Sequence, residues 1–313
     1  MSTRVWRWLR LALGLALIVA LLPILLTPEF WSTLAGVNVP LVVVAALFSA
    51  ASVISKAWRW GAVMRWRGIP LSASYLVSSY FISVFFNNFL PSGMGGDVVR
   101  AYETARDTGQ RAASVIGVVI ERGSGMLSLF AAGSLGALFV PGIPTSIVLL
   151  AHGLFIGSLV AIAVLWSDAA ANLLTRLTRI FPTRLRSVWD KMLRLHAEFR
   201  AYRHEWRLFV TVMAQSVVTL ITTLMSVYAL LLAFDQHVAF GAFAAVFAIV
   251  TAIDVIPLSL NGLGIREGSY VYFLGLLGVA TEAALGIAVL VRLIVTLLAL
   301  IGGLAFLWRS TRH

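Results

Sequence analysis

Residues 74–100 read SYLVSSYFISVFFNNFLPSGMGGDVVR, and this stretch decides the fold of the chain. It begins as an apolar run, but the run stops at Pro91, short of the roughly 20 residues that a helix needs to cross a bilayer. A glycine-rich polar motif follows. Proline ends a helix, and the glycines after it permit a tight turn and close backbone approach. The stretch therefore resembles half of a broken-helix hairpin, and the flanking segments test that interpretation.

Six other apolar runs are long enough to be transmembrane helices. They cover residues 9–26, 39–55, 112–139, 145–167, 207–233 and 282–307. The first run follows three arginines, but it is long for a signal peptide and no small-residue cleavage site follows it. We therefore interpret it as a retained helix.

Lys and Arg concentrate in cytoplasmic loops of membrane proteins. This rule places the N-terminus, the basic loop 56–67 and the basic loop 168–207 in the cytoplasm. The helix at 112–139 must then run outward, so residues 97–111, which carry three arginines, are also cytoplasmic. Residues 74–96 thus begin and end on the same side. A re-entrant hairpin satisfies this count, because irregular backbone at membrane depth is tolerated against protein or a cavity.

The same count of membrane crossings predicts a second hairpin in the other half of the chain. This hairpin enters from the exterior within residues 239–281. Its motif reads IDVIPLSLNGLGIREGSYVY from Ile253, and it aligns without a gap on the first motif when Pro257 is placed on Pro91. The alignment pairs Asn88 with Asp254, Gly96 with Gly262 and Arg100 with Arg266. We predict one integral membrane domain, 1–313, that contains inverted repeat units at about 74–139 and 239–307. Secondary transporters commonly have this architecture.

Composition supports a membrane protein and excludes several other classes. The chain has 60% hydrophobic and 12% charged residues, where soluble proteins have about 25% charged residues. It contains no Cys, and no two of its five His have a metal-ligand spacing. We therefore predict no metal, no cofactor and no enzymatic activity. The net charge of +11 follows from the cytoplasmic loops and does not indicate nucleic acid.

Arginines inside the apolar helices are the residues that most strongly indicate a functional site. Arg122 and Arg292 each lie about ten residues into an apolar run, where a cation costs roughly 2.5–3.5 kcal/mol on insertion scales. They should face the protein interior or a wet cavity, and helix N-termini after the glycine turns could bind a phosphate beside them. The alternative is a structural network in which Glu121 pairs across helices. The predicted substrate-binding residues are Asn88, Gly95, Gly96, Asp97, Arg100, Glu121, Arg122, Asp254, Asn261, Gly262, Gly264, Arg266, Glu267 and Arg292.

Three segments carry a resemblance to a known family: FFNNFLPSGMGGDVVRAYETAR, VIERGSGML and IPLSLNGLGIREGSYVYFLGLLGV. Together they resemble the flippase-like family, also called the lysylphosphatidylglycerol synthase transmembrane region. The resemblance covers nearly the whole chain. It implies that both motifs, Arg122 and Arg292 line a path for a lipid headgroup. In bifunctional members a soluble aminoacyl-transferase domain follows, whereas this sequence ends at His313, so we do not expect it to synthesise lysyl-lipid alone.

These observations predict an all-α polytopic protein of the cytoplasmic membrane, with about six spans, two re-entrant hairpins and both termini in the cytoplasm. The predicted function is non-enzymatic translocation of an anionic phospholipid or a polyprenyl-phosphate-linked lipid. A membrane lipid is the expected partner, and the oligomeric state stays open. Two alternatives are a membrane-embedded transferase that uses a polyprenyl-phosphate donor and an accessory subunit of a lipid or glycan synthesis pathway.

Overall fold

A computed structural model describes residues 26–90, 94–139, 143–177, 193, 196–197, 199–255 and 264–310. Throughout these ranges the regular structure is helical, without a strand. The predicted helix at 9–26 lies outside the described residues. The remaining helices are sufficient to test the predicted hairpins.

Among the described residues, five helices are long and apolar enough to cross a membrane. They are α3 (Val39–Trp66), α6 (Arg111–Gly136), α7 (Thr145–Trp166), α10 (Trp206–Ala233) and α13 (Thr281–Ser310). They correspond to the five predicted spans that fall within the described residues. The chain is therefore an all-α polytopic membrane protein, as the sequence predicted.

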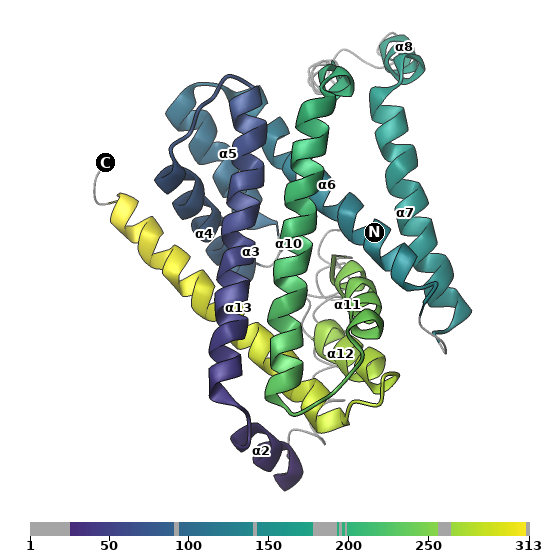
Figure 1. Cartoon of the computed structure of the whole chain (residues 1–313). Coiled ribbons are helices and arrows are strands. Elements are labelled where there is room, and N and C mark those ends of the chain that lie inside the picture. Colours follow the sequence, from purple (N-terminus) through teal and green to yellow (C-terminus); the bar gives the residue numbers. More distant parts are fainter. Residues whose placement is uncertain are drawn as a thin grey trace, which may run out of the picture.

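Shorter helices connect and flank these spans (Figure 1). They are α2 (Pro28–Ala35), α4 (Ala73–Phe89), α5 (Gly95–Thr108), α8 (Asp168–Leu177), the 3₁₀ turn η2 (Tyr202–His204), α11 (Phe240–Val255) and α12 (Ile265–Gly275). Two pairs of these helices flank the two glycine-rich motifs.

The two pairs enter the bundle from opposite ends, as Figure 1 shows. The helices α4 and α5 occupy the half in which α3 ends and α6 begins, whereas α11 and α12 occupy the half in which α10 ends and α13 begins. We call α4–α6 unit A and α11–α13 unit B. Each unit consists of two short helices around a motif and then one long helix, and the long helices α6 and α13 run in opposite directions. This arrangement is that of the predicted inverted repeat.

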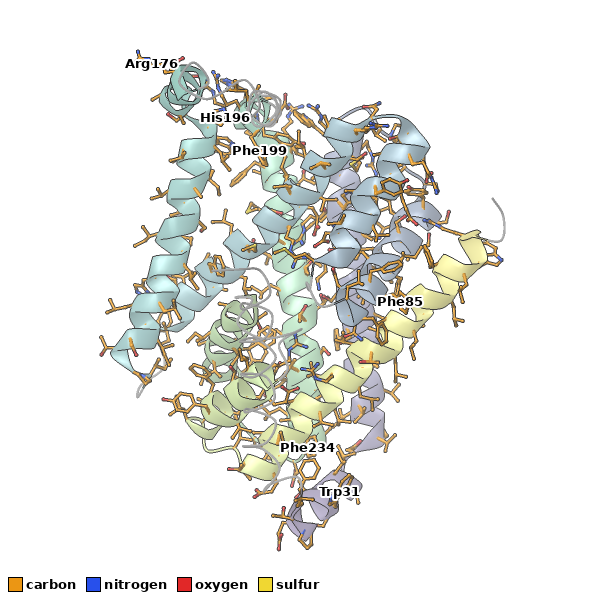
Figure 2. All side chains as sticks on the ribbon, turned by 180° about the vertical axis from the view of Figure 1, so that it is seen from behind. Trp31, Phe85, Arg176, His196, Phe199 and Phe234 are labelled. Carbon is orange, nitrogen blue, oxygen red and sulfur yellow. The ribbon has the colours of Figure 1, made fainter. Side chains whose placement is uncertain are left out.

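The long helix of each unit packs on the first short helix of the other unit: α6 on α11, and α13 on α4. Glycines bring these backbones together. A Cβ on Gly302 of α13 would collide with the carbonyl of Phe81, and one on Gly136 of α6 would lie 2.6 Å from Cα of Ala245. Figure 2 shows Phe85 of α4 beside α13. Small residues at helix crossings are typical of membrane proteins, where close packing replaces the hydrophobic effect.

A polar seam joins α3 to α10. Three hydroxyl pairs cross it, with oxygen–oxygen distances of 2.8, 2.7 and 2.8 Å. They are Ser49–Ser226, Ser52–Thr223 and Ser55–Thr219. Hydrogen bonds between helices in lipid are worth about 0.6–2 kcal/mol each. The seam therefore holds α3 and α10 together between the two units.

The predicted basic loop at 56–67 is wrong for residues 56–66, which are helical. The helix α3 continues to Trp66, so Lys56 and Arg59 lie within a helix and inside the bundle. Arg59 is only 4% exposed. Its charge ended the apolar run in the sequence, but the buried partners Glu121 and Ser216 compensate for that charge.

Candidate functional site

A buried carboxylate, Glu121 on α6, organises the polar interior of unit A. Its Oε1 accepts hydrogen bonds from Nε of Arg59 at 3.1 Å and from the hydroxyl of Tyr80 at 3.1 Å. Its Oε2 accepts from Nη2 of Arg100 at 2.9 Å. Glu121 is 2% exposed and both arginines are similarly buried. Glu121 therefore pairs across helices, as the structural alternative proposed, with charged partners from α3 and α5.

The Arg100 guanidinium lies between two aromatic rings. Its Cζ is 4.4 Å from the ring centroid of Tyr80 and 4.8 Å from that of Trp60. Nη2 also donates to Oδ1 of Asp97 at 3.2 Å. Cation–π contacts and a second carboxylate offset the desolvation of this fully buried charge. Arg100 is thus part of a structural network, and its side chain is fully buried.

Asp97 joins this network to Arg122. While Oδ1 of Asp97 binds Arg100, Oδ2 accepts a hydrogen bond from Nη1 of Arg122. The Arg122 side chain is 37% exposed, in contrast to the buried Arg100. The chain of alternating charges that starts at Arg59 therefore ends in an accessible cation, which both a carboxylate and a ligand could bind.

The glycines of the first motif serve close packing. Gly95 and Gly96 are the first two residues of α5, and a Cβ on Gly96 would collide with the carbonyl of Ser83 on α4. The N–H of Gly96 donates to Oδ1 of Asn87 at 2.8 Å. The motif thus fixes the start of α5 against α4, and this position determines where Asp97 lies.

Unit B contains an ion pair equivalent to the Asp97–Arg122 pair of unit A. Gly264 precedes α12 with φ of 78°, a left-handed conformation that favours glycine. Its N–H donates to Oε2 of Glu267 at 2.8 Å, and Nε of Arg292 donates to Oε1 of the same carboxylate at 2.7 Å. In each unit, therefore, a carboxylate in the first turn of the short helix binds an arginine of the following long helix.

The equivalence of Arg100 and Arg266, predicted from the proline alignment, needs correction. Arg100 is the sixth residue of α5, whereas Arg266 is the second residue of α12. The residues at equivalent positions are Asp97 and Glu267, each the third residue of its helix. Because the gap-free alignment is displaced by about one helical turn, Arg100 and Arg266 have different environments.

Arg266 lines a cavity between the two units. This central cavity has a volume of about 250 Å³ and receives residues from α3, α4, α10, α12 and α13. Lys56 contributes a second cation, and Asn87 and Asn88 contribute amides. The amide nitrogen of Asn88 is 3.4 Å from Oγ1 of Thr296 on α13, so Asn88 connects the units. Two cations and two amides therefore meet in this cavity.

Three predicted site residues lie outside what the structure describes. They are Asn261, Gly262 and the side chain of Asp254. The other eleven belong to one of the two carboxylate–arginine networks, to the helix starts that position them or to the central cavity. Sequence reasoning missed Lys56, Arg59 and Asn87. One signal could have found the first two: Ser49, Ser52, Ser55, Lys56 and Arg59 recur at helical spacing, so the helix could continue past the first charge.

The fold and these paired charges define a polytopic membrane protein built from two oppositely oriented broken-helix units, with ionisable groups in its interior. The family model described as "Lysylphosphatidylglycerol synthase TM region" matches residues 7–303, and the chain belongs to this family. The match confirms the resemblance of the motifs. None of the curated proteins compared with the chain matched it.

Proposed function

We propose that the protein moves a lipid with an anionic headgroup between the two leaflets of the membrane, without chemical conversion of the lipid. The observation that supports this most directly is the central cavity, because it is polar, lies between the two inverted units and contains Lys56 and Arg266 in its lining. Transporters with inverted repeats hold their substrates in this place, where broken helices meet.

The charge balance of the interior favours an anionic substrate. Among the side chains that the structure describes in the two networks and the central cavity, six are cations and three are carboxylates. The cations are Lys56, Arg59, Arg100, Arg122, Arg266 and Arg292, and the carboxylates are Asp97, Glu121 and Glu267. Charges inside a membrane protein are costly, so an interior with more cations than carboxylates favours an anionic ligand. A phosphate would reduce this excess of positive charge.

Arg292 has a spare donor for such a group. Its Nε binds Glu267, while Nη2 is buried and has no hydrogen-bond acceptor among the described residues. A guanidinium presents its N–H groups as a fork that matches a phosphate or carboxylate. Arg292 can therefore bind a headgroup oxygen through Nη2 without release of its own carboxylate.

The first turn of α5 separates the central cavity from a groove on the other side. Asn87 lines the central cavity and binds the backbone of Gly96, and the next residue, Asp97, lines the groove between α5 and α6 together with Arg122. In this proposal a headgroup replaces Asp97 as the partner of Arg122 and then passes this turn. Alternating access would require that the headgroup also passes the first turn of α12, which belongs to the oppositely oriented unit.

A transport assay tests the proposal. The full chain is reconstituted in vesicles that contain fluorescent phosphatidylglycerol, and the exchange of the label between leaflets is followed by quenching from outside. Lys56→Gln should lower the initial rate about tenfold or more, because one charge-assisted hydrogen bond contributes roughly 1.5–3 kcal/mol. Lys56→Arg should keep most of the rate, and so should Arg207→Gln, which removes an exposed charge at the start of α10. Equal rates for vesicles with and without wild-type protein would exclude the proposed function.

A further inference from the structure

The groove between α5 and α6 combines exposed apolar walls with three arginines. It has a volume of about 1100 Å³. Val98 and Tyr102 on its α5 wall are 68% and 67% exposed. Arg106 and Arg111 lie toward the connection of the two helices, and Arg122 lies deeper. We call this surface the arginine groove.

The three arginines span a large depth. Arg111 is the first residue of α6 and Arg122 is the twelfth, so they are about 16 Å apart along the helix at 1.5 Å per residue. The hydrocarbon core is about 30 Å thick. A headgroup that moves along the arginine groove from Arg111 to Arg122 would therefore reach about half of the membrane depth and keep a cationic partner at both ends.

A second, apolar cavity lies on the other side of α6, between α7 and α10. It has a volume of about 460 Å³, within the usual range for small-molecule sites. Its two serines, Ser124 and Ser158, donate to backbone carbonyls of their own helices, so they leave the lining apolar. In α7 only Ala151 is buried among the described residues, and the helix therefore covers this space loosely. We call this space the chain cavity.

The arginine groove and the chain cavity meet across α6. Val119, Gly123 and Met126 line both. A Cβ on Gly123 would have no neighbour within 4 Å, so the surface of α6 is open at this crossing. On the opposite wall, Gly153 and Gly157 of α7 also face open space. A hydrocarbon chain could therefore pass over Gly123 between α6 and α7.

We propose that the arginine groove and the chain cavity form one binding site for a lipid with a net anionic phosphate headgroup. The phosphate lies against Arg122, and one hydrocarbon chain crosses α6 at Gly123 into the chain cavity. The charge of the groove selects the anionic headgroup, and the apolar lining of the cavity selects the chain, so the occupant has to be a lipid and not a free anion. This inference rests on the proposed function, since it names the site at which the substrate would first be bound.

The test uses photoreactive lipids with a diazirine near the end of one chain. The full-length protein is reconstituted with labelled phosphatidylglycerol, labelled polyprenyl phosphate or labelled phosphatidylethanolamine, and crosslinked peptides are quantified by mass spectrometry. We expect crosslinks on the faces of α6 and α7 that line the chain cavity. Gly123→Leu should reduce them about tenfold, whereas the control Gly241→Leu, a helical glycine that also faces open space, should leave them unchanged.

A second variant separates headgroup recognition from folding. Arg122→Gln should reduce the preference for the two anionic lipids over phosphatidylethanolamine, whose phosphate is balanced by an ammonium group, while total crosslinking at α7 persists. The two anionic lipids themselves distinguish a diacyl substrate from a polyprenyl one. Crosslinks confined to the outer face of α7, at Leu149, Ile156 and Val160, would overturn the proposal, because they would report only bulk lipid. Insertion of residues 9–26 into the chain cavity, seen as crosslinks within the protein, would also overturn it.

The crosslinking experiment tests lipid binding separately from lipid exchange. Arg292→Ala should lower lipid exchange about tenfold or more but leave these crosslinks in place, because Arg292 belongs to unit B. Binding without any exchange in the wild-type protein would reject the proposed function and keep this site. Exchange without crosslinks in the chain cavity would reject this site and keep the proposed function.

Discussion

Arg122 and Arg292 occupy the same position in two helices of opposite direction. Each is the twelfth residue of its helix, α6 or α13, and each binds a carboxylate 25 residues earlier in the sequence. The two carboxylates, Asp97 and Glu267, are each the third residue of the preceding short helix. The two units therefore share the helix positions of the carboxylate and of the arginine, and also the number of residues between them. As a result, each half of the bundle contains an equivalent ion pair.

The proposed function predicts that both pairs contribute to transport. Arg122→Ala and Arg292→Ala should each lower lipid exchange about tenfold or more, because each removes a cation that a passing phosphate would bind. The measurement is the rate of exchange of fluorescent phosphatidylglycerol in vesicles. Arg207→Ala, which removes an exposed charge, is the control and should remain within a factor of two or so. Wild-type rates for both variants would contradict the headgroup path.

Glu121 should matter more for stability than any other carboxylate of unit A. Glu121→Gln leaves Arg59 and Arg100 buried without their shared counterion, and loss of one partner of a buried pair costs about 3–5 kcal/mol. The thermal unfolding midpoint in detergent should fall by several degrees. Glu29→Gln removes an exposed carboxylate from α2 and should leave the midpoint unchanged. A Glu121→Gln protein as stable as the wild type would show that the network is not a structural element.

Sequence alone was sufficient for the five long helices of the described residues, for the two oppositely placed pairs of short helices and for the position of Arg122 and Arg292 inside long helices. These features depend on local patterns: run length, helix-breaking proline and charge in an apolar context. The partner of Arg122 was harder to predict. Asp97 reaches it because Gly96 allows α5 to start directly against α4, and this close approach has no sequence signature beyond the glycine itself.

Two errors have clear physical causes. The end of α3 was placed at Lys56 because a charge usually marks the membrane boundary, but Glu121 and Ser216 satisfy Arg59 inside the bundle. The proline alignment failed because the linker between Pro257 and Glu267 is four residues longer than that between Pro91 and Asp97. A gap-free alignment cannot register an insertion in a glycine-rich linker.

The crossing of α13 and α4 should be sensitive to one methyl group. Gly302→Ala would push a Cβ into the carbonyl of Phe81, and overpacking of this kind costs about 1–3 kcal/mol. We expect a lower unfolding midpoint and slower lipid exchange. Gly153→Ala, on a helix where the added Cβ has open space, is the matched control and should change stability by less than about 0.5 kcal/mol. Equal stability of the two variants would mean that the helices can separate without cost.

The orientation of the two units in the membrane can be measured in this chain, because it contains no Cys. The positive-inside rule predicts that the connection between α5 and α6 is cytoplasmic and the connection between α10 and α11 is exterior. Gln110 and His237 are exposed in these connections, so Gln110→Cys and His237→Cys provide accessible labels. In intact cells an impermeant maleimide should label the second variant only, and permeabilised cells should show labelling of both. Labelling of Gln110→Cys in intact cells would reverse the predicted topology, and with it the side from which a lipid enters the arginine groove.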